Sequence, residues 1–239
     1  MPDRRRNARL WLHGLAAALA GSLLGACTSA HAPDAPYHVD RSNRAELGRQ
    51  ASVALLRAVD LPGWTEAPSE GVDVVGLRIL QACGAHLSAD LHIAVEKNVR
   101  WRRGTPRPVL DQSVYGLDQP LGPTAVDDAS AALTCSTYQS AIRNEDTVDR
   151  VRPFDTPPAP PGARTFGYCE RGSVTHATRC VLLVGAGNLV CSVNAASDSE
   201  TDARKTIVDL NPTVVRLCVG AATMTPSPSS TATASPAAT

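Results

Sequence analysis

The chain has 239 residues, with 23 basic and 23 acidic side chains and only 4% aromatic residues. This balance gives no electrostatic footprint for nucleic acid, so we expect no nucleic-acid partner; without residues 1–26 the net charge is −3. Because aromatic residues are scarce, the core must rely on Val, Leu, Ile and Ala, which bury less apolar area each. A thin core of this kind is often reinforced covalently.

Residues 1–26 are predicted to be an export signal. Arginines lie within the first nine residues, and residues 10–24 are apolar but too short to cross a bilayer comfortably. The sequence Leu24-Gly25-Ala26-Cys27 then resembles the lipobox of bacterial lipoproteins, in which the cysteine accepts diacylglycerol and becomes the new N-terminus. The alternative is an ordinary secretory signal that only leaves Cys27 near its cleavage site. We expect lipid on Cys27 to anchor the chain at the extracytoplasmic side of the cell membrane, with residues 27–40 as a flexible tether.

Residues 41–221 are expected to form one globular domain. A helix is predicted over residues 44–59, with Ser42 as a cap and a stop at residues 61–64. Strands are predicted over residues 91–102, 109–116 and 148–154, and a short helix over residues 127–133. The final helix spans residues 200–217, and Asn211-Pro212 is expected to kink or split it. This order favours an α+β fold, an antiparallel sheet flanked by helices with the C-terminal helix packed on the sheet.

Residues 164–196 are predicted to be a β-meander. Strands at residues 165–170, 181–184 and 189–193 surround a turn at residues 185–188. If Val184 faces Leu189, alternate residues of both strands share one core face, and these include Cys180 and Cys191.

Six cysteines remain besides Cys27: Cys83, Cys135, Cys169, Cys180, Cys191 and Cys218. An even number in an exported chain indicates three disulfides, and the lack of a Cys-x-x-Cys pair argues against zinc. The meander places Cys169 opposite Cys180 and directs Cys191 toward the final helix, near Cys218, which leaves Cys83 to join Cys135. Six cysteines allow many other pairings, so the preferred set is one of several that remain open.

Candidates for chemistry are few. His86, Asp90 and His92 come nearest to a metal site, with Asp90 and His92 on one face of a strand, but no third ligand is evident, and exposed polar residues explain them equally well. His176 lies beside Ser173 in a hairpin loop, without the strained turn that a serine nucleophile needs. We therefore expect no catalytic residues, no metal and no cofactor.

Two other segments have simple interpretations. Arginines 100, 102 and 103 surround Trp101 in a short basic cluster that is typical of an exposed strand end. Residues 222–239 contain Thr, Ser, Pro and Ala with one Met and no charge, so this tail is expected to be disordered. Its hydroxyl groups could accept O-linked sugars.

Several of these features together resemble the actinobacterial sensor-domain lipoproteins, which are related to the PknH-like extracellular domain of receptor kinases. The resembling features are the helix that ends at residues 60–64, Cys83, the strand at residues 109–115, the helix end at residues 129–135, the hairpin at residues 185–193 and the terminal helix with Cys218. The resemblance covers residues 41–220 and implies a sheet flanked by helices, with a cleft for an unidentified ligand. It also supports the pairing of Cys83 with Cys135. The extra cysteines of the meander, the missing kinase domain and the tail depart from it, so any signal would have to pass through a partner.

The sequence therefore predicts a non-catalytic, membrane-tethered domain that binds or senses an unidentified ligand. Its expected partners are the membrane, through the lipid on Cys27, and an envelope ligand or a membrane protein. One alternative is a structural or partner-interaction envelope lipoprotein without a small-molecule ligand. Another is a hydrolase of unfamiliar type that uses His86, His92 or His176.

Overall fold

A computed structural model describes residues 41–68, 77–104, 107–139 and 147–224. All of them belong to one compact unit. The predicted signal, Cys27, the tether at residues 27–40 and most of the tail lie outside the described residues. The proposed domain boundaries at these positions stay predictions.

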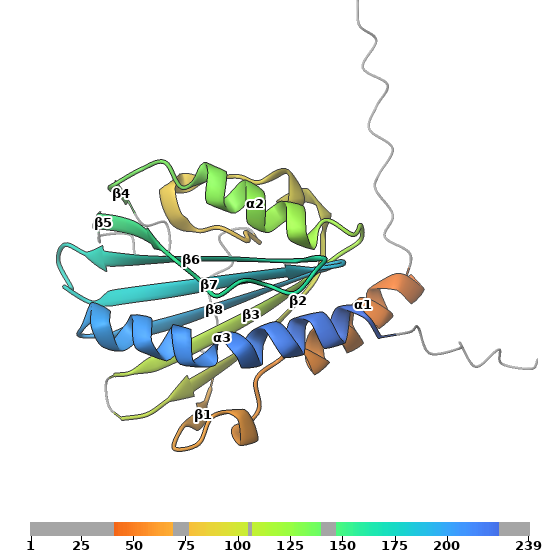
Figure 1. The fold of residues 1–239 in the computed structure, drawn as a ribbon, viewed down its shortest axis with the longest axis horizontal. Helices are drawn as coiled ribbons and strands as arrows, with labels where there is room; N and C mark the ends of the chain where they lie inside the picture. Colours follow the sequence, from red (N-terminus) through yellow and green to blue (C-terminus); the bar gives the residue numbers. More distant parts are fainter. Residues whose placement is uncertain (1–40, 69–76, 105–106, 140–146, 225–239) are drawn as a thin grey trace, which may run out of the picture. The chain divides into compact units, whose positions relative to one another are not determined.

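The described chain is built around an eight-stranded antiparallel sheet in the order β1-β2-β3-β8-β7-β6-β5-β4 (Figure 1). Four strands are β1 (Thr65–Ala67), β2 (Ile93–Arg102), β3 (Val109–Leu117) and β4 (Tyr138–Gln139). The others are β5 (Thr147–Phe154), β6 (Ala163–Gly172), β7 (Thr178–Ala186) and β8 (Leu189–Ser197). The predicted antiparallel α+β fold is confirmed, and the short edge strands β1 and β4 are additions to the prediction.

Helices cover both faces of the sheet. The helices are α1 (Arg41–Val53), α2 (Gly122–Ala132) and α3 (Glu200–Ala222), with 3-10 turns η1 (Ala58–Asp60), η2 (Ala82–Gly84) and η3 (Ser88–His92). Helix α3 packs on β7 and β8, and α2 packs on β6 and β7 from the opposite side (Figure 1). We call the two sides the α3 face and the α2 face. The C-terminal helix packs on the sheet as predicted.

All three α-helices differ from the prediction in their extent, and α2 begins at Gly122, five residues before its predicted start. Helix α1 ends at Val53 because Gln112 of β3 takes over the next backbone groups: its amide nitrogen donates to the Ala54 carbonyl at 3.0 Å, and its amide oxygen accepts the Leu56 N–H at 2.7 Å. Helix α3 continues through Pro212 as one helix, so the predicted alternative of two separate helices is wrong. The Ser199 hydroxyl caps α3 by accepting the Asp202 N–H at 3.3 Å.

The register of the β7–β8 hairpin also differs from the prediction. Its turn consists of Gly187 and Asn188 alone, so Val184 lies opposite Cys191 instead of Leu189. A shift of two residues leaves every side chain on its predicted face, because successive side chains of a strand alternate between faces. The predicted core face, with Cys180 and Cys191 on it, is therefore confirmed.

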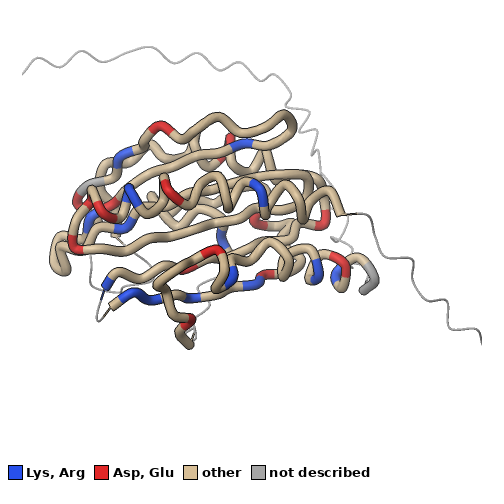
Figure 2. The backbone as a smooth tube through the Cα atoms, turned by 60° about the horizontal axis from the view of Figure 1, so that its bottom comes forward, with Lys and Arg blue, Asp and Glu red and all other residues tan. Residues whose placement is uncertain are grey.

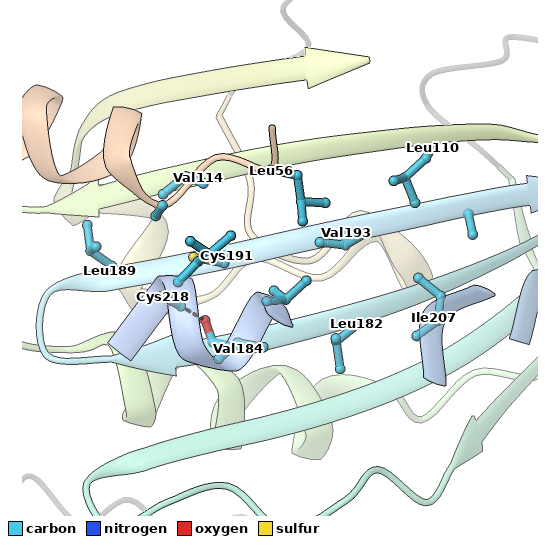
Figure 3. Packing of buried hydrophobic residues seen from close by; sticks show 14 of the residues in the cluster. Leu56, Leu110, Val114, Leu182, Val184, Leu189, Cys191, Val193, Ile207 and Cys218 are labelled. Atoms are coloured by element: carbon cyan, nitrogen blue, oxygen red, sulfur yellow. Dashed lines mark hydrogen bonds between the residues drawn. The ribbon is translucent and has the colours of Figure 1, made fainter. Parts of the chain in front are cut away.

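Aliphatic side chains fill the core on the α3 face, as the composition predicts (Figure 3). A second buried cluster lies on the α2 face, where α2 approaches the sheet very closely. A Cβ atom on Gly185 of β7 would lie 2.1 Å from the Gly122 carbonyl oxygen at the start of α2. Only glycine fits this contact, which fixes the distance of α2 from the sheet.

Two of the three predicted disulfides are present: Cys83 is bonded to Cys135, and Cys169 is bonded to Cys180 across β6 and β7. Cys191 and Cys218 lie side by side in the α3-face core, as predicted, but the predicted disulfide between them is absent and both are free thiols. The Cys218 thiol donates instead to the Val184 carbonyl at 3.4 Å (Figure 3). A buried thiol packs as a small apolar side chain, so the closed aliphatic core accommodates both without a bond.

Candidate ligand-binding face

Part of the α2 face carries polar side chains, and none of the described helices packs on it. In the register of β2, β3 and β8, Arg100, Asp111 and Asn194 form one row across the strands, and Asn98 and Ser113 lie in the adjacent row. We call these five residues the open strand face. Among the described helices, α1 is the one packed on β2 and β3, and it lies on the α3 face, where Leu47 approaches Gly116.

The open strand face offers both hydrogen-bond donors and acceptors. Arg100 and Asp111 form a bidentate ion pair, with Nε–Oδ1 and Nη2–Oδ2 distances of 2.5 and 3.3 Å. Asn98 is exposed, and Ser113 and Asn194 are half-buried. A hollow of about 420 Å³ borders Asn98 and Arg100 at the β1 edge. Neutral amides and hydroxyls lose water at a lower cost than charges, so this surface suits a ligand rich in hydroxyl or amide groups.

A buried charged cluster lies on the same face of the sheet, beside β8. It consists of Glu170, Arg179, Tyr138 and Gln81, and we call it the Glu170 cluster. The Glu170 carboxylate is 6% exposed; it accepts Arg179 Nε at 2.6 Å and the Tyr138 hydroxyl at 2.6 Å, and it also contacts Arg179 Nη2. Arg179 donates in addition to the Gln81 side-chain oxygen at 3.4 Å. Every charge taken from water is therefore compensated, as buried ion pairs require.

The electrostatics of the cluster keep its groups in these protonation states. Burial, reinforced by the Glu170 carboxylate, raises the pKa of Tyr138 and of Tyr168. Burial opposes the charge on Arg179, but Glu170 and the two tyrosines together hold the pKa of this guanidinium above its ordinary value. At neutral pH the tyrosines are hydroxyl donors and the arginine is a cation.

The Cys83–Cys135 disulfide holds the outer members of this cluster. Gln81 lies two residues before Cys83, and Tyr138 lies three residues after Cys135. The bond thus ties η2 to the chain just before β4, and both segments reach the same ion pair. The cluster was not predicted from the sequence. The signal was available, because pairing Cys169 with Cys180 places Glu170 directly opposite Arg179.

The residues considered for metal binding or catalysis do not come together. Asp90 and His92 both lie in the 3-10 turn η3 and not on a strand. The prediction that they share one face of a strand is therefore wrong. The Asp90 carboxylate accepts the Ile79 and Leu87 N–H groups, each at 2.9 Å, while His92 Nδ1 lies 2.9 Å from Asp118. His86 is exposed. In the part of the chain that the structure describes, no three potential metal ligands form a group.

His176 is exposed in the β6–β7 turn, with a φ angle of +50°. Within the described ranges, no hydrogen bond joins its ring to Ser173, so these residues do not form a dyad. The basic stretch behaves largely as predicted for a strand end, except that Trp101 is buried in the core. Figure 2 shows Lys and Arg interspersed with Asp and Glu along the backbone, and Arg107, just before β3, pairs with Asp198 at 2.6 Å.

None of the described helices is both long and apolar enough to span a bilayer. No protein-family model matches the chain. No curated protein matches it either. Among solved structures, the extracellular domain of PknH from Mycobacterium tuberculosis is similar in fold, with a TM-score of 0.45 and 14% sequence identity. The match covers 70% of this chain and 95% of that domain.

Proposed function

We propose that the chain is an extracytoplasmic lipoprotein whose domain binds a ligand, without turning it over, at the open strand face. The observation that supports this best is the change from polar, accessible side chains to buried ones along one face of the sheet. The row that carries Arg100, Asp111 and Asn194 continues into Val181 and Tyr168, which are buried beneath the α2 layer. Polar groups in register on three strands form a rigid, preorganised surface, which lowers the entropy lost on binding.

Among the described residues, the side chains considered for catalysis lie apart from one another, which favours binding over catalysis. Nucleophilic catalysis needs the two side chains within hydrogen-bond reach and a third group to orient the base. The His92 ring is oriented by Asp118, whose carboxylate oxygen lies 2.9 Å from Nδ1. The free thiols of Cys191 and Cys218 are buried in the core on the other face.

The proposed location rests on the disulfides and on the N-terminal pattern. Disulfides such as Cys83–Cys135 persist in oxidising compartments outside the cytosol. The lipobox-like sequence before Cys27 would supply the lipid anchor. Intact-mass analysis of native protein should show a chain that begins at Cys27 with added acyl mass. A Cys27→Ala variant should move from the detergent phase to the aqueous phase; identical partitioning of both proteins would refute the anchor.

Ligand binding is tested by thermal-shift screening of the mature protein against envelope glycan fragments, peptides and phospholipid vesicles. A glycan fragment should raise the melting temperature of the wild type and of a Lys97→Ala control, since Lys97 lies on the opposite face of β2. The same fragment should have a smaller effect on Asn98→Ala. Uniform absence of shifts, together with one protein that co-purifies in stoichiometric amount, would instead favour the partner-interaction alternative.

A further inference from the structure

A second candidate site lies on the α3 face, away from the open strand face. It is a pocket of about 530 Å³ between the loop after η1, the β2–β3 hairpin, the end of β8 and the first turns of α3. Its apolar lining consists of Leu61, Pro62, Trp64, Pro108 and Leu210. The volume falls within the range of small-molecule sites, roughly 300–1,000 Å³.

Most charges around this pocket already have partners. Lys205 donates to Asp209 at 2.6 Å, one turn further along α3. The Asp60 carboxylate accepts the Arg57 N–H at 3.1 Å and an Arg216 nitrogen at 3.4 Å. The charges of these groups are therefore largely neutralised by each other, and the groups form part of the pocket wall.

Two opposite charges in the lining have no ion-pair partner among the described residues, and they come from different elements. The Arg103 guanidinium lies over the Trp64 ring, 5.4 Å from its centroid, and forms no ion pair with a described carboxylate. The Asp202 carboxylate is in the first turn of α3, where the helix dipole favours its negative charge. The backbone of Asp202 donates its N–H to the Ser199 cap and accepts the Thr206 hydroxyl at 2.9 Å, whereas no hydrogen bond to its carboxylate is found among the described residues.

We propose that this pocket binds a zwitterion with an apolar side chain, an α-amino acid or a short peptide. The ligand carboxylate pairs with the planar fork of Arg103, its ammonium group pairs with Asp202, and its side chain packs on Trp64 and Leu210. A cation and an anion that have no ion-pair partner among the described residues, together with an apolar floor, match the three parts of such a ligand. A simple anion or cation would satisfy only one of the two charges.

The test is a fluorescence titration of the mature protein. Trp64 lines the pocket while Trp101 is 3% exposed, so ligand-dependent changes report on Trp64. The probes are L-leucine, leucyl-leucine, L-leucinamide, which lacks the carboxylate, and N-acetyl-L-leucine, which lacks the ammonium group. We expect saturable binding of leucine if the natural ligand is an amino acid, or of leucyl-leucine if it is a short peptide. Each blocked analogue should bind about tenfold more weakly, since one charge-assisted hydrogen bond is lost.

Two variants separate recognition from folding. Arg103→Gln should bind leucine and leucinamide equally, and Asp202→Asn should no longer distinguish leucine from its N-acetyl derivative. Glu200→Gln, in the same helical turn but outside the pocket lining, should keep both preferences. No saturable response, equal binding of all four probes by the wild type, or a response to a neutral trisaccharide alone would overturn the proposal. None of these results depends on Asn98, so the outcome is independent of the proposed function.

Discussion

Replacing Arg179 with methionine tests whether the Glu170 cluster stabilises the α2 side of the sheet. Methionine retains much of the aliphatic stem but leaves Glu170 with a single donor in the cluster, the Tyr138 hydroxyl at 2.6 Å. Breaking a buried ion pair from one side costs about 3–5 kcal/mol. Because the Arg179 side chain is 20% exposed, we expect the lower end, about 3 kcal/mol.

Urea and thermal unfolding measure this loss. For a domain of this size, 3 kcal/mol corresponds to a fall in melting temperature of about 6–12 °C. The matched control is Arg164→Met, which removes a surface bridge to Asp127 whose side chains are 56% and 61% exposed. Its effect should stay within about 0.5 kcal/mol. Adding Glu170→Gln to Arg179→Met should restore part of the stability, because the unpaired buried charge is then gone. A loss below about 1 kcal/mol for Arg179→Met would refute this account of the cluster.

Three further predictions concern the core. Gly185→Ala should destabilise the domain by about 3 kcal/mol, since its Cβ would clash with the Gly122 backbone, whereas Gly220→Ala, with open space around it, should be neutral or stabilising in the same unfolding assay. Thiol titration of native protein should detect neither Cys191 nor Cys218, and denaturation should reveal both; a denatured sample without thiols would contradict the two free cysteines. Burial raises the pKa of Tyr168 in the folded state, so its stabilising contribution is present below about pH 10 and is lost as pH rises further, when the unfolded chain releases the proton first. The Tyr168 signal is the phenolate absorbance that a Tyr168→Phe variant lacks; if this signal develops in the wild type without loss of circular dichroism, the prediction is disproved.

Local patterns predicted the strands well because side-chain alternation is a property of each strand by itself. The hairpin between β7 and β8 shows the limit of this reasoning. Alternation identified the core face correctly but left the register two residues out, because the turn tightened to Gly187 and Asn188. The end of α1 was missed for a related reason: Gln112, more than fifty residues away, supplies the hydrogen bonds that replace the next helical turn.

The candidate sites depend on tertiary structure and were largely hidden in the sequence. Whether Asn98 and Asn194 face solvent depends on which part of the α2 face the helices leave uncovered, and no local pattern records that. The cysteines show a different limit. Strand pairing correctly joined Cys169 to Cys180, but an even number of cysteines did not require Cys191 to be oxidised, since an aliphatic core accepts a thiol.

Isothermal titration of the mature protein with envelope glycan fragments tests the central claim, ligand binding at the open strand face, most directly. Wild-type protein and Lys97→Ala should give the same saturable heat. A double variant, Asn98→Ala with Asn194→Ala, should bind at least about tenfold more weakly because two hydrogen-bonding side chains are removed. Equal affinity of the double variant and the wild type would contradict the assignment of this face, and the absence of heat with every fragment would contradict the proposed ligand class.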